Sequence, residues 1–257
     1  MSTDQFSVAG ETAIVTGASS GIGREIATRF AADGADVVVC SRAQDRIDPV
    51  AEAINAADGG RARAVECDVR DRAAVEAMVA AGVEAFGPPT CLVNNAGAGF
   101  MAPFAELSEN AWKTIVDINL HGTFHCAQAA GARMRDGQGG TIVNIASVAG
   151  QKGTPEMSHY SAAKAAVINL TTTLAYEWAP DGVRVNCIAP GFVATPGVAE
   201  QMGVTAEDID RGTVDRRIGT SAEIADIAQF LASPAASYLV GETVTAMGVP
   251  RIEEPEV

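Results

Sequence analysis

The stretch Thr12-Ala-Ile-Val-Thr16-Gly17-Ala-Ser-Ser-Gly21-Ile-Gly23 decides the fold of this 257-residue chain. Thr12–Thr16 is a β-branched, apolar run that predicts a buried strand, and the helical pattern that follows the glycines ends at Gly34. Glycines let a backbone approach phosphates closely, and the N–H groups and dipole of a helix N-terminus favour negative charge. We therefore expect a dinucleotide pyrophosphate to bind at Gly17, Ser19, Ser20, Gly21, Ile22 and Gly23.

Apolar runs alternate with helical patterns along the rest of the chain, which is typical of parallel strands joined by crossover helices. We expect strands at 12–16, 35–40, 62–67, 90–93, 140–146, 183–189 and 243–246. We expect helices at 24–33, 45–57, 73–86, 109–134 with a break or bend near Gly122, 161–178, and 223–232 with Ser221 as its cap. This predicts an α/β fold: one Rossmann-type, doubly wound parallel sheet of about seven strands with helices on both faces.

No linker rich in proline, glycine or serine divides the chain, so we expect a single domain over residues 1–257. The segment 191–219 has no regular pattern. A long loop in a compact α/β domain is often a binding loop, so this segment is a candidate substrate lid. The acidic tail at 250–257 is expected to be mobile.

Composition excludes several classes of protein. The net charge of −14 disfavours nucleic acid and anionic membranes as partners. The chain has neither a signal-peptide pattern nor a bilayer-spanning apolar run, so we expect a cytoplasmic protein. Its acidic, lysine-poor surface suits a salt-rich cytoplasm, although a GC-rich genome would also explain it. The odd number and wide spacing of the cysteines (40, 67, 91, 126 and 187) predict buried hydrophobic residues rather than disulfides.

Two pairs of residues have the spacing of one helix face. His121 and His125 lack further cysteine or histidine ligands nearby, so we expect no metal site. Tyr160 and Lys164 place a phenol and an ammonium one helical turn apart. A cation within about 4–6 Å lowers the pKa of a phenol toward neutral pH. The second pair suits a general acid/base, although alone it is a weak signal that also occurs on solvated helix faces.

Further motifs follow the predicted strands, and together they resemble the short-chain dehydrogenase/reductase family over residues 8–248. They are the glycine-rich turn, Asn94-Asn95-Ala96-Gly97, Asn119, Ser147, Tyr160 with Lys164, and Pro190-Gly191. The resemblance implies an enzyme whose catalytic group is Asn119, Ser147, Tyr160 and Lys164. Tyr160 would give a proton to a carbonyl or take one from an alcohol, and Ser147 would hydrogen-bond the same oxygen. Lys164 would bind the nicotinamide ribose and lower the tyrosine pKa, and Asn119 would hold a water of a proton relay.

The end of the second strand selects between NAD and NADP in this family, because a carboxylate there would repel a 2′-phosphate. Ser41-Arg42 has no carboxylate. A guanidinium binds phosphate through charge-assisted hydrogen bonds, and the Ser41 hydroxyl adds another donor, so we predict NADP(H). The alternative is that Arg42 is a solvated surface residue. The resemblance also implies cofactor contacts from Asp68, Val69, Asn95, Ala96, Gly97, Tyr160, Lys164, Pro190, Gly191, Val193 and Thr195, with Asn94 tying strands together.

The substrate is expected to be a small carbonyl or alcohol compound. Whole-chain resemblance favours the reduction by NADPH of a 3-oxoacyl thioester carried on CoA or acyl carrier protein. Residues 110–115 and 233–238 also resemble enoyl- and dienoyl-CoA reductases. The lid has side chains that could hold an acyl chain and carrier phosphates, or lie on a solvated helix: Met202, Val204, Ile209, Arg211, Arg216 and Arg217.

Two alternatives to this function stay open. One is an NADP-linked dehydrogenase of sugars, polyols or secondary alcohols, and the other is a non-catalytic NADP-binding redox sensor. The resemblance further implies a homotetramer or homodimer. The family's last strand and tail build part of that assembly, and here they end in the atypical Met247-Gly248-Val249.

Overall fold

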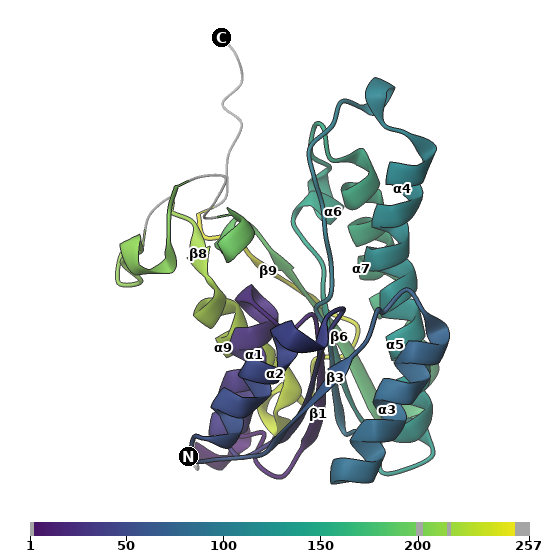
Figure 1. Cartoon of the computed structure of the whole chain (residues 1–257), viewed down its shortest axis with the longest axis vertical. Helices are drawn as coiled ribbons and strands as arrows, with labels where there is room; N and C mark the ends of the chain where they lie inside the picture. The colour runs from purple at the N-terminus through teal and green to yellow at the C-terminus, as the bar shows by residue number, and fades with distance from the viewer. Residues whose placement is uncertain (1–2, 199–202, 215–216, 250–257) are drawn as a thin grey trace.

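Seven parallel strands form one sheet in the order β3-β2-β1-β4-β5-β6-β9 in the computed structural model (Figure 1), which describes residues 3–198, 203–214 and 217–249. The strands are β1 (Thr12–Thr16), β2 (Asp36–Ser41), β3 (Ala62–Glu66), β4 (Cys91–Asn94), β5 (Gly140–Ile145), β6 (Val183–Pro190) and β9 (Thr243–Ala246). The chain winds outward from β1 first toward β3 and then toward β9. The predicted doubly wound sheet is therefore confirmed, and ligands bind such sheets where the strand order reverses.

Helices cover both faces of the sheet (Figure 1). On one face lie α1 (Gly21–Ala32), α2 (Gln44–Asn55) and α9 (Ser221–Ala232). On the other lie α3 (Arg72–Phe86), α4 (Glu109–Val116), α5 (Gly122–Arg135) and α7 (Ser158–Trp178). One apolar core, which includes Phe30 and Leu231, lies under the first set, and a second core, with Met78 and Trp178, lies under the second. Because helices cover both faces of the sheet, the central strands are buried on both sides, and this explains why they are continuous apolar runs.

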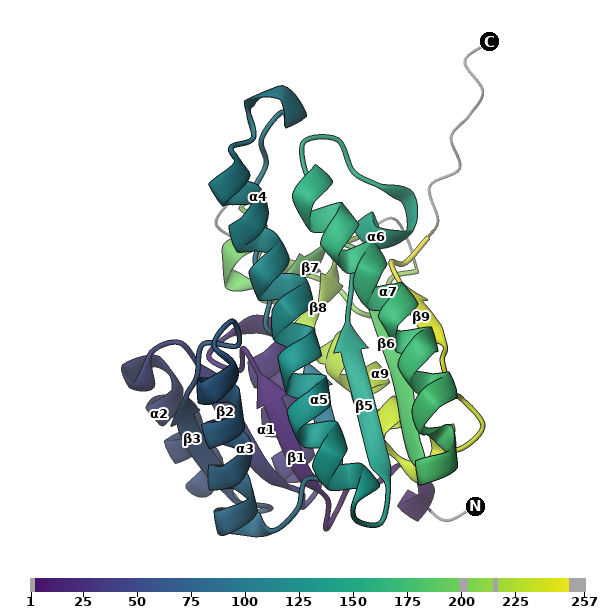
Figure 2. The same cartoon turned by 90° about the vertical axis from the view of Figure 1, so that its right-hand side faces the viewer.

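The predicted helix over 109–134 is interrupted, as expected, but by a π-helical turn over Asp117–His121. Figure 2 shows α5 continuing from α4 beyond this turn. A π-turn widens the helix by one residue and re-aims the side chains that it carries, and it is frequently found at functional sites. Asn119, a predicted catalytic residue, lies in the middle of it.

Two expectations about 191–223 are corrected. Thr220, not Ser221, caps α9: its hydroxyl accepts from the Glu223 amide at 3.3 Å, while the Glu223 carboxylate accepts from the Thr220 amide at 2.8 Å. The segment 191–219 is also not irregular throughout. The short strands β7 (Val193–Ala194) and β8 (Gly219–Thr220) pair in parallel, and this pairing holds the two ends of the segment together. The sequence analysis also missed the short helix α6 (Ala149–Lys152).

All five cysteines are buried and free, which confirms their prediction as small core residues. Within the described ranges, no helix is long and apolar enough to cross a bilayer. The acidic tail 250–257, Met202 and Arg216 lie outside the described residues.

Candidate active site

The glycine-rich turn joins β1 to α1 where the strand order reverses. Gly17 has φ +64°, and a Cβ there would lie 2.8 Å from the Cα of Ala96. A Cβ at Gly23 would lie 2.3 Å from Nδ2 of Asn95. Side chains at either position would therefore collide with the residues that follow β4. At the start of α1, Ser20 is the N-cap but makes no side-chain capping bond. The first-turn N–H groups are thus not capped by it, as a phosphate site requires.

Asn95 fastens the end of β4 to this turn. Its side-chain amide donates to the carbonyls of Thr16 at 2.9 Å and Gly17 at 3.1 Å. The backbone amides of Asn95 and Ala96 both donate to the Thr16 hydroxyl oxygen at 3.0 Å. These bonds hold the glycine turn and the 95–97 segment side by side. Asn94 instead donates to Asn144 of β5 at 2.9 Å, which confirms its predicted role of tying strands together.

A cleft of about 350 Å³ opens at these chain segments. Thirteen predicted cofactor residues line it: Gly17, Ser19, Ser20, Gly21, Ile22, Ser41, Arg42, Asp68, Val69, Asn95, Ala96, Gly97 and Thr195. Six lining residues were not predicted: Arg46, Cys67, Ala98, Ile118, Pro196 and Gly197. Six other predicted residues do not line it: Gly23, Tyr160, Lys164, Pro190, Gly191 and Val193. The start of α1, which has no side-chain cap from Ser20, and the glycine-rich turn before it fit the pyrophosphate of a dinucleotide.

The missed residues carried different signals in the sequence. Four of them adjoin predicted site residues: Cys67, Ala98, Ile118 and Pro196. Arg46 lies four positions after Arg42, and this spacing alone does not distinguish a ligand from a solvated side chain.

Asn119 and Lys164 meet at one end of this region, beside Gly97. A Cβ at Gly97 would lie 2.8 Å from Oδ1 of Asn119 and 3.3 Å from Nζ of Lys164. The Asn119 amide group donates to the carbonyls of Ala98 at 2.7 Å and Ile115 at 2.8 Å, which leaves its buried Oδ1 without a partner among the described residues. The π-turn thus directs Asn119 toward the 97–98 segment.

Tyr160 and Lys164 lie in the first turns of α7, as their spacing predicted. The Lys164 ammonium nitrogen is 5.7 Å from the centre of the Tyr160 ring and donates to the Ile145 carbonyl at 2.7 Å. Ser147, just after β5, is close enough to Tyr160 to act on the pKa of its hydroxyl. Parallel strands end at the same sheet edge, so β5 delivers Ser147 to the tyrosine that α7 carries there.

Burial dominates the electrostatics of this group. Burial raises the pKa of the Tyr160 hydroxyl, so the expected lowering of this pKa by Lys164 is not observed, and Ser147 acts against the effect of burial. Burial also lowers the pKa of Lys164 from 10.5 to about 8. Near neutral pH, therefore, Tyr160 holds its proton and Lys164 is cationic. This pair can donate a proton to a substrate oxygen and stabilise the phenolate that remains.

The lid arginines make contacts within the protein. Arg211 pairs with Asp226 of α9 at 2.9 Å, and Arg217 pairs with Glu223 at 2.6 Å. Both guanidiniums therefore anchor the candidate lid to α9, and this does not favour the idea that they bind carrier phosphates. The histidine pair is also engaged, with His121 Nδ1 2.8 Å from the Asp117 carboxylate and His125 Nδ1 3.0 Å from the Val69 carbonyl.

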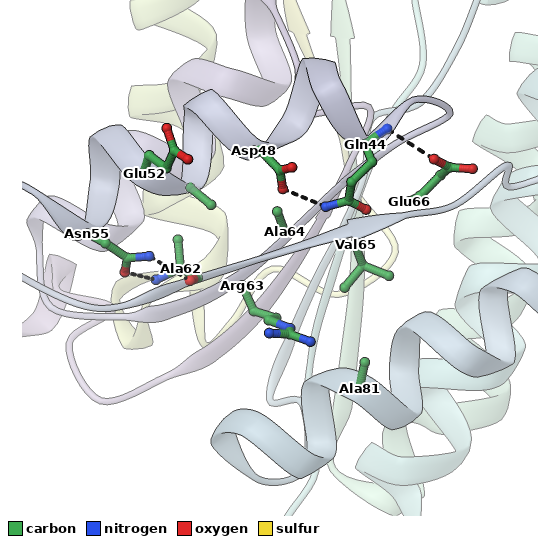
Figure 3. A pocket seen from close by; sticks show the side chains of 11 residues that line it. Gln44, Asp48, Glu52, Asn55, Ala62, Arg63, Ala64, Val65, Glu66 and Ala81 are labelled. Carbon is green, nitrogen blue, oxygen red and sulfur yellow. Dashed lines mark hydrogen bonds between the residues drawn. The ribbon is translucent and has the colours of Figure 1, made fainter.

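A second groove, of about 610 Å³, lies between α2 and β3 (Figure 3). Asp48, Glu52 and Glu66 are among its lining residues, and Asn55 hydrogen-bonds the backbone of Ala62 across it. None of the predicted site residues lines this groove. The candidate active site is therefore the cleft at the glycine turn together with the adjoining side chains of Asn119, Ser147, Tyr160 and Lys164.

Known proteins resemble this chain over nearly its whole length. The family model for short chain dehydrogenases matches residues 11–203. The short-chain reductase protein NovJ of Streptomyces niveus is 42% identical over 96% of both chains. The 3-oxoacyl-[acyl-carrier-protein] reductase of Synechocystis is 40% identical and covers 93% of this chain and 96% of its own length.

Solved structures share the fold. A 3-oxoacyl-[acyl-carrier protein] reductase from Brucella melitensis with bound NAD has a TM-score of 0.85 and 35% identity, covering 96% of this chain and 93% of its own. A candidate NAD(P)-dependent gluconate 5-dehydrogenase from Beutenbergia cavernae, with NADP at low occupancy, has a TM-score of 0.84 and 38% identity, with coverages of 94% and 96%. The chain belongs to the short-chain dehydrogenase family and is an oxidoreductase built to bind a nicotinamide cofactor.

Proposed function

We propose that this enzyme is an NADPH-dependent carbonyl reductase, and that its substrate is a 3-oxoacyl thioester. The observation that carries the proposal is the gathering of Asn119, Ser147, Tyr160 and Lys164 beside a cleft with the glycine cradle of a dinucleotide site. The alternative of a redox sensor without turnover is set aside, because the family membership makes the protein an oxidoreductase.

In the proposed mechanism, the cofactor supplies the hydride when it is bound. Tyr160 gives its proton to the substrate oxygen, and Ser147 donates a hydrogen bond to the same oxygen as charge develops on it. The Lys164 cation, which lies 5.7 Å from the phenol ring, stabilises the resulting phenolate. Oδ1 of Asn119, beside Lys164, accepts no hydrogen bond from the described part of the chain, and it would hold the water through which the proton is replaced.

The thioester substrate is supported by the relatives rather than by the cleft. The Synechocystis relative and two chains from Staphylococcus epidermidis are named as 3-oxoacyl-[acyl-carrier-protein] reductases. The similarity to the gluconate 5-dehydrogenase candidate favours a second function, an NADP-linked dehydrogenase of sugar acids, polyols or secondary alcohols. A Bacillus subtilis relative is named as a probable 2,4-dienoyl-CoA reductase. Its name supports a thioester substrate but refers to a different reaction.

Initial rates with acetoacetyl-CoA, measured with NADPH and separately with NADH, test this proposal. We expect turnover that prefers NADPH and is lost in Tyr160→Phe, while that variant still binds NADPH by fluorescence. Tyr176→Phe is the matched control, because Tyr176 lies on the same helix but is 81% exposed, so its turnover should equal the wild type. Oxidation of gluconate or another alcohol with NADP, without acetoacetyl-CoA reduction, would select the second function instead.

We also propose that the enzyme assembles as a homodimer or homotetramer. Two large apolar side chains are exposed on the helices of one face, namely Trp112 of α4 and Phe124 of α5. Exposed apolar groups of this size often mark surfaces between subunits. Light scattering coupled to size exclusion would measure the mass, and a monomer would contradict this part of the proposal.

A further inference from the structure

Two arginines line the cleft near the end of β2. Arg42 comes from the loop after β2, and Arg46 comes from the first turn of α2. Neither makes an ion pair among the described residues, whereas seven other arginines do: Arg29, Arg61, Arg70, Arg72, Arg135, Arg211 and Arg217. In a chain with a net charge of −14, two cations without carboxylate partners at one cleft favour an anionic ligand there.

The other polar groups at this end are already engaged. The Ser41 hydroxyl donates to the Ala43 carbonyl at 2.9 Å and accepts from the Ala43 amide at 3.3 Å, so it closes a local turn. The Asp68 carboxylate accepts from Nε of Arg70 at 3.0 Å, and this bond holds its pKa below the usual range. The Arg42 cation acts on Asp68 in the same direction but more weakly. The two guanidiniums are therefore the donors that remain at this end.

We infer that Arg46 acts with Arg42 as a two-arginine clamp for the 2′-phosphate of NADP, and that Ser41 shapes the loop instead of binding the phosphate. A guanidinium is a planar fork of N–H donors that matches phosphate oxygens, and a phosphate has enough oxygens for two forks. The clamp departs from the expectation that Ser41 and Arg42 bind the phosphate together. The clamp rests on the proposed use of NADPH. It makes Arg46, which lies in α2 and not at the end of β2, a residue that determines cofactor specificity.

Binding of two small nucleotides isolates this site from turnover. Isothermal titration of the cofactor-free enzyme would compare 2′,5′-ADP, which carries the phosphate, with 5′-AMP, which lacks it. A charge-assisted hydrogen bond typically changes affinity about tenfold or more. We expect Arg46→Ala to weaken 2′,5′-ADP binding by about that factor and to leave 5′-AMP binding unchanged. Arg46→Lys, which keeps the charge but loses the fork, should give a smaller loss.

Two control variants sharpen the comparison. Arg63→Ala removes the same charge from an exposed arginine of β3 that lines the separate groove in Figure 3, and it should bind both nucleotides as the wild type does. Ser41→Ala should keep the wild-type ratio of the two affinities, because its hydroxyl is used within the loop.

Each other result has a distinct meaning. A wild type that binds 2′,5′-ADP no better than 5′-AMP would overturn the NADPH proposal and the clamp with it. A wild type that prefers 2′,5′-ADP, with the preference intact in Arg46→Ala, would overturn the clamp alone. Equal loss of both nucleotides together with a lower melting temperature would also overturn it, because Arg46 would then be only a structural residue.

Discussion

Replacing Lys164 by methionine is expected to abolish turnover and yet leave the folded protein as stable as the wild type or more so. Lys164 is 3% exposed, and its ammonium group donates to the Ile145 carbonyl at 2.7 Å. Keeping a charged group in such a place costs free energy that an apolar side chain of similar length does not cost. The proposed catalytic role and the stability of the fold therefore oppose each other at this residue.

The size of the effect follows from the pKa of Lys164, which burial lowers from 10.5 to about 8. One pKa unit corresponds to about 1.36 kcal/mol, so holding the cation in the folded state costs about 3 kcal/mol below pH 8. Methionine removes this cost but leaves the Ile145 carbonyl without its donor, which costs about 1–3 kcal/mol. We expect a net gain of about 0–2 kcal/mol in the free energy of unfolding at neutral pH.

The dependence on pH is the sharper test. Between pH of about 8 and pH 10.5, the unfolded lysine keeps a proton that the folded lysine has lost. The wild type should therefore gain about 3 kcal/mol relative to Lys164→Met over this window, with a constant difference below it. Urea unfolding of both cofactor-free proteins, at one protein concentration, measures this. Lys152→Met, at an exposed lysine of α6, should show no such trend. A wild-type-to-variant difference that is the same at neutral pH and at pH 10.5 would refute the reasoning.

Three further predictions follow from particular contacts. Gly17→Ala should lower the melting temperature and weaken NADPH binding in a fluorescence titration, because its Cβ would lie 2.8 Å from the Cα of Ala96 at φ +64°. Arg184→Met should destabilise the enzyme by about 3 kcal/mol in urea unfolding, since its guanidinium donates to four carbonyls at the end of α9 and the turn after it. Arg217 holds the pKa of Glu223 at about 2, so Glu223 stabilises the fold above pH 4.5 and loses this effect as the pH falls toward 2. Arg217→Gln should therefore show a shallower fall in melting temperature across that acid range, measured by scanning calorimetry.

The long elements could be predicted because their signals are local. β1 and β9 have the predicted bounds, and the other strands of the sheet differ by a residue or so at their ends. Buried parallel strands are unbroken apolar runs, and the glycine and helix patterns between them are equally local. The sequence analysis missed α6 and the β7–β8 pair because these elements are too short to show a repeating apolar pattern. In addition, β7 and β8 form strands only because they pair with each other from the two ends of the candidate lid.

The doubly wound sheet could be predicted from the sequence, and so could the common helix face of Tyr160 and Lys164, because such a pair needs only the period of one helix to share a face. Contacts between elements are visible only in the folded chain. The tertiary structure brings Asn119 and Lys164 together at Gly97 and lowers the pKa of Lys164 by burial. It also sets Arg46 in the cleft and pairs the lid arginines with α9. Burial arises from the packing of segments far apart in the chain, and an ion pair depends on how a loop folds back on its helix, so no local pattern of the sequence records them.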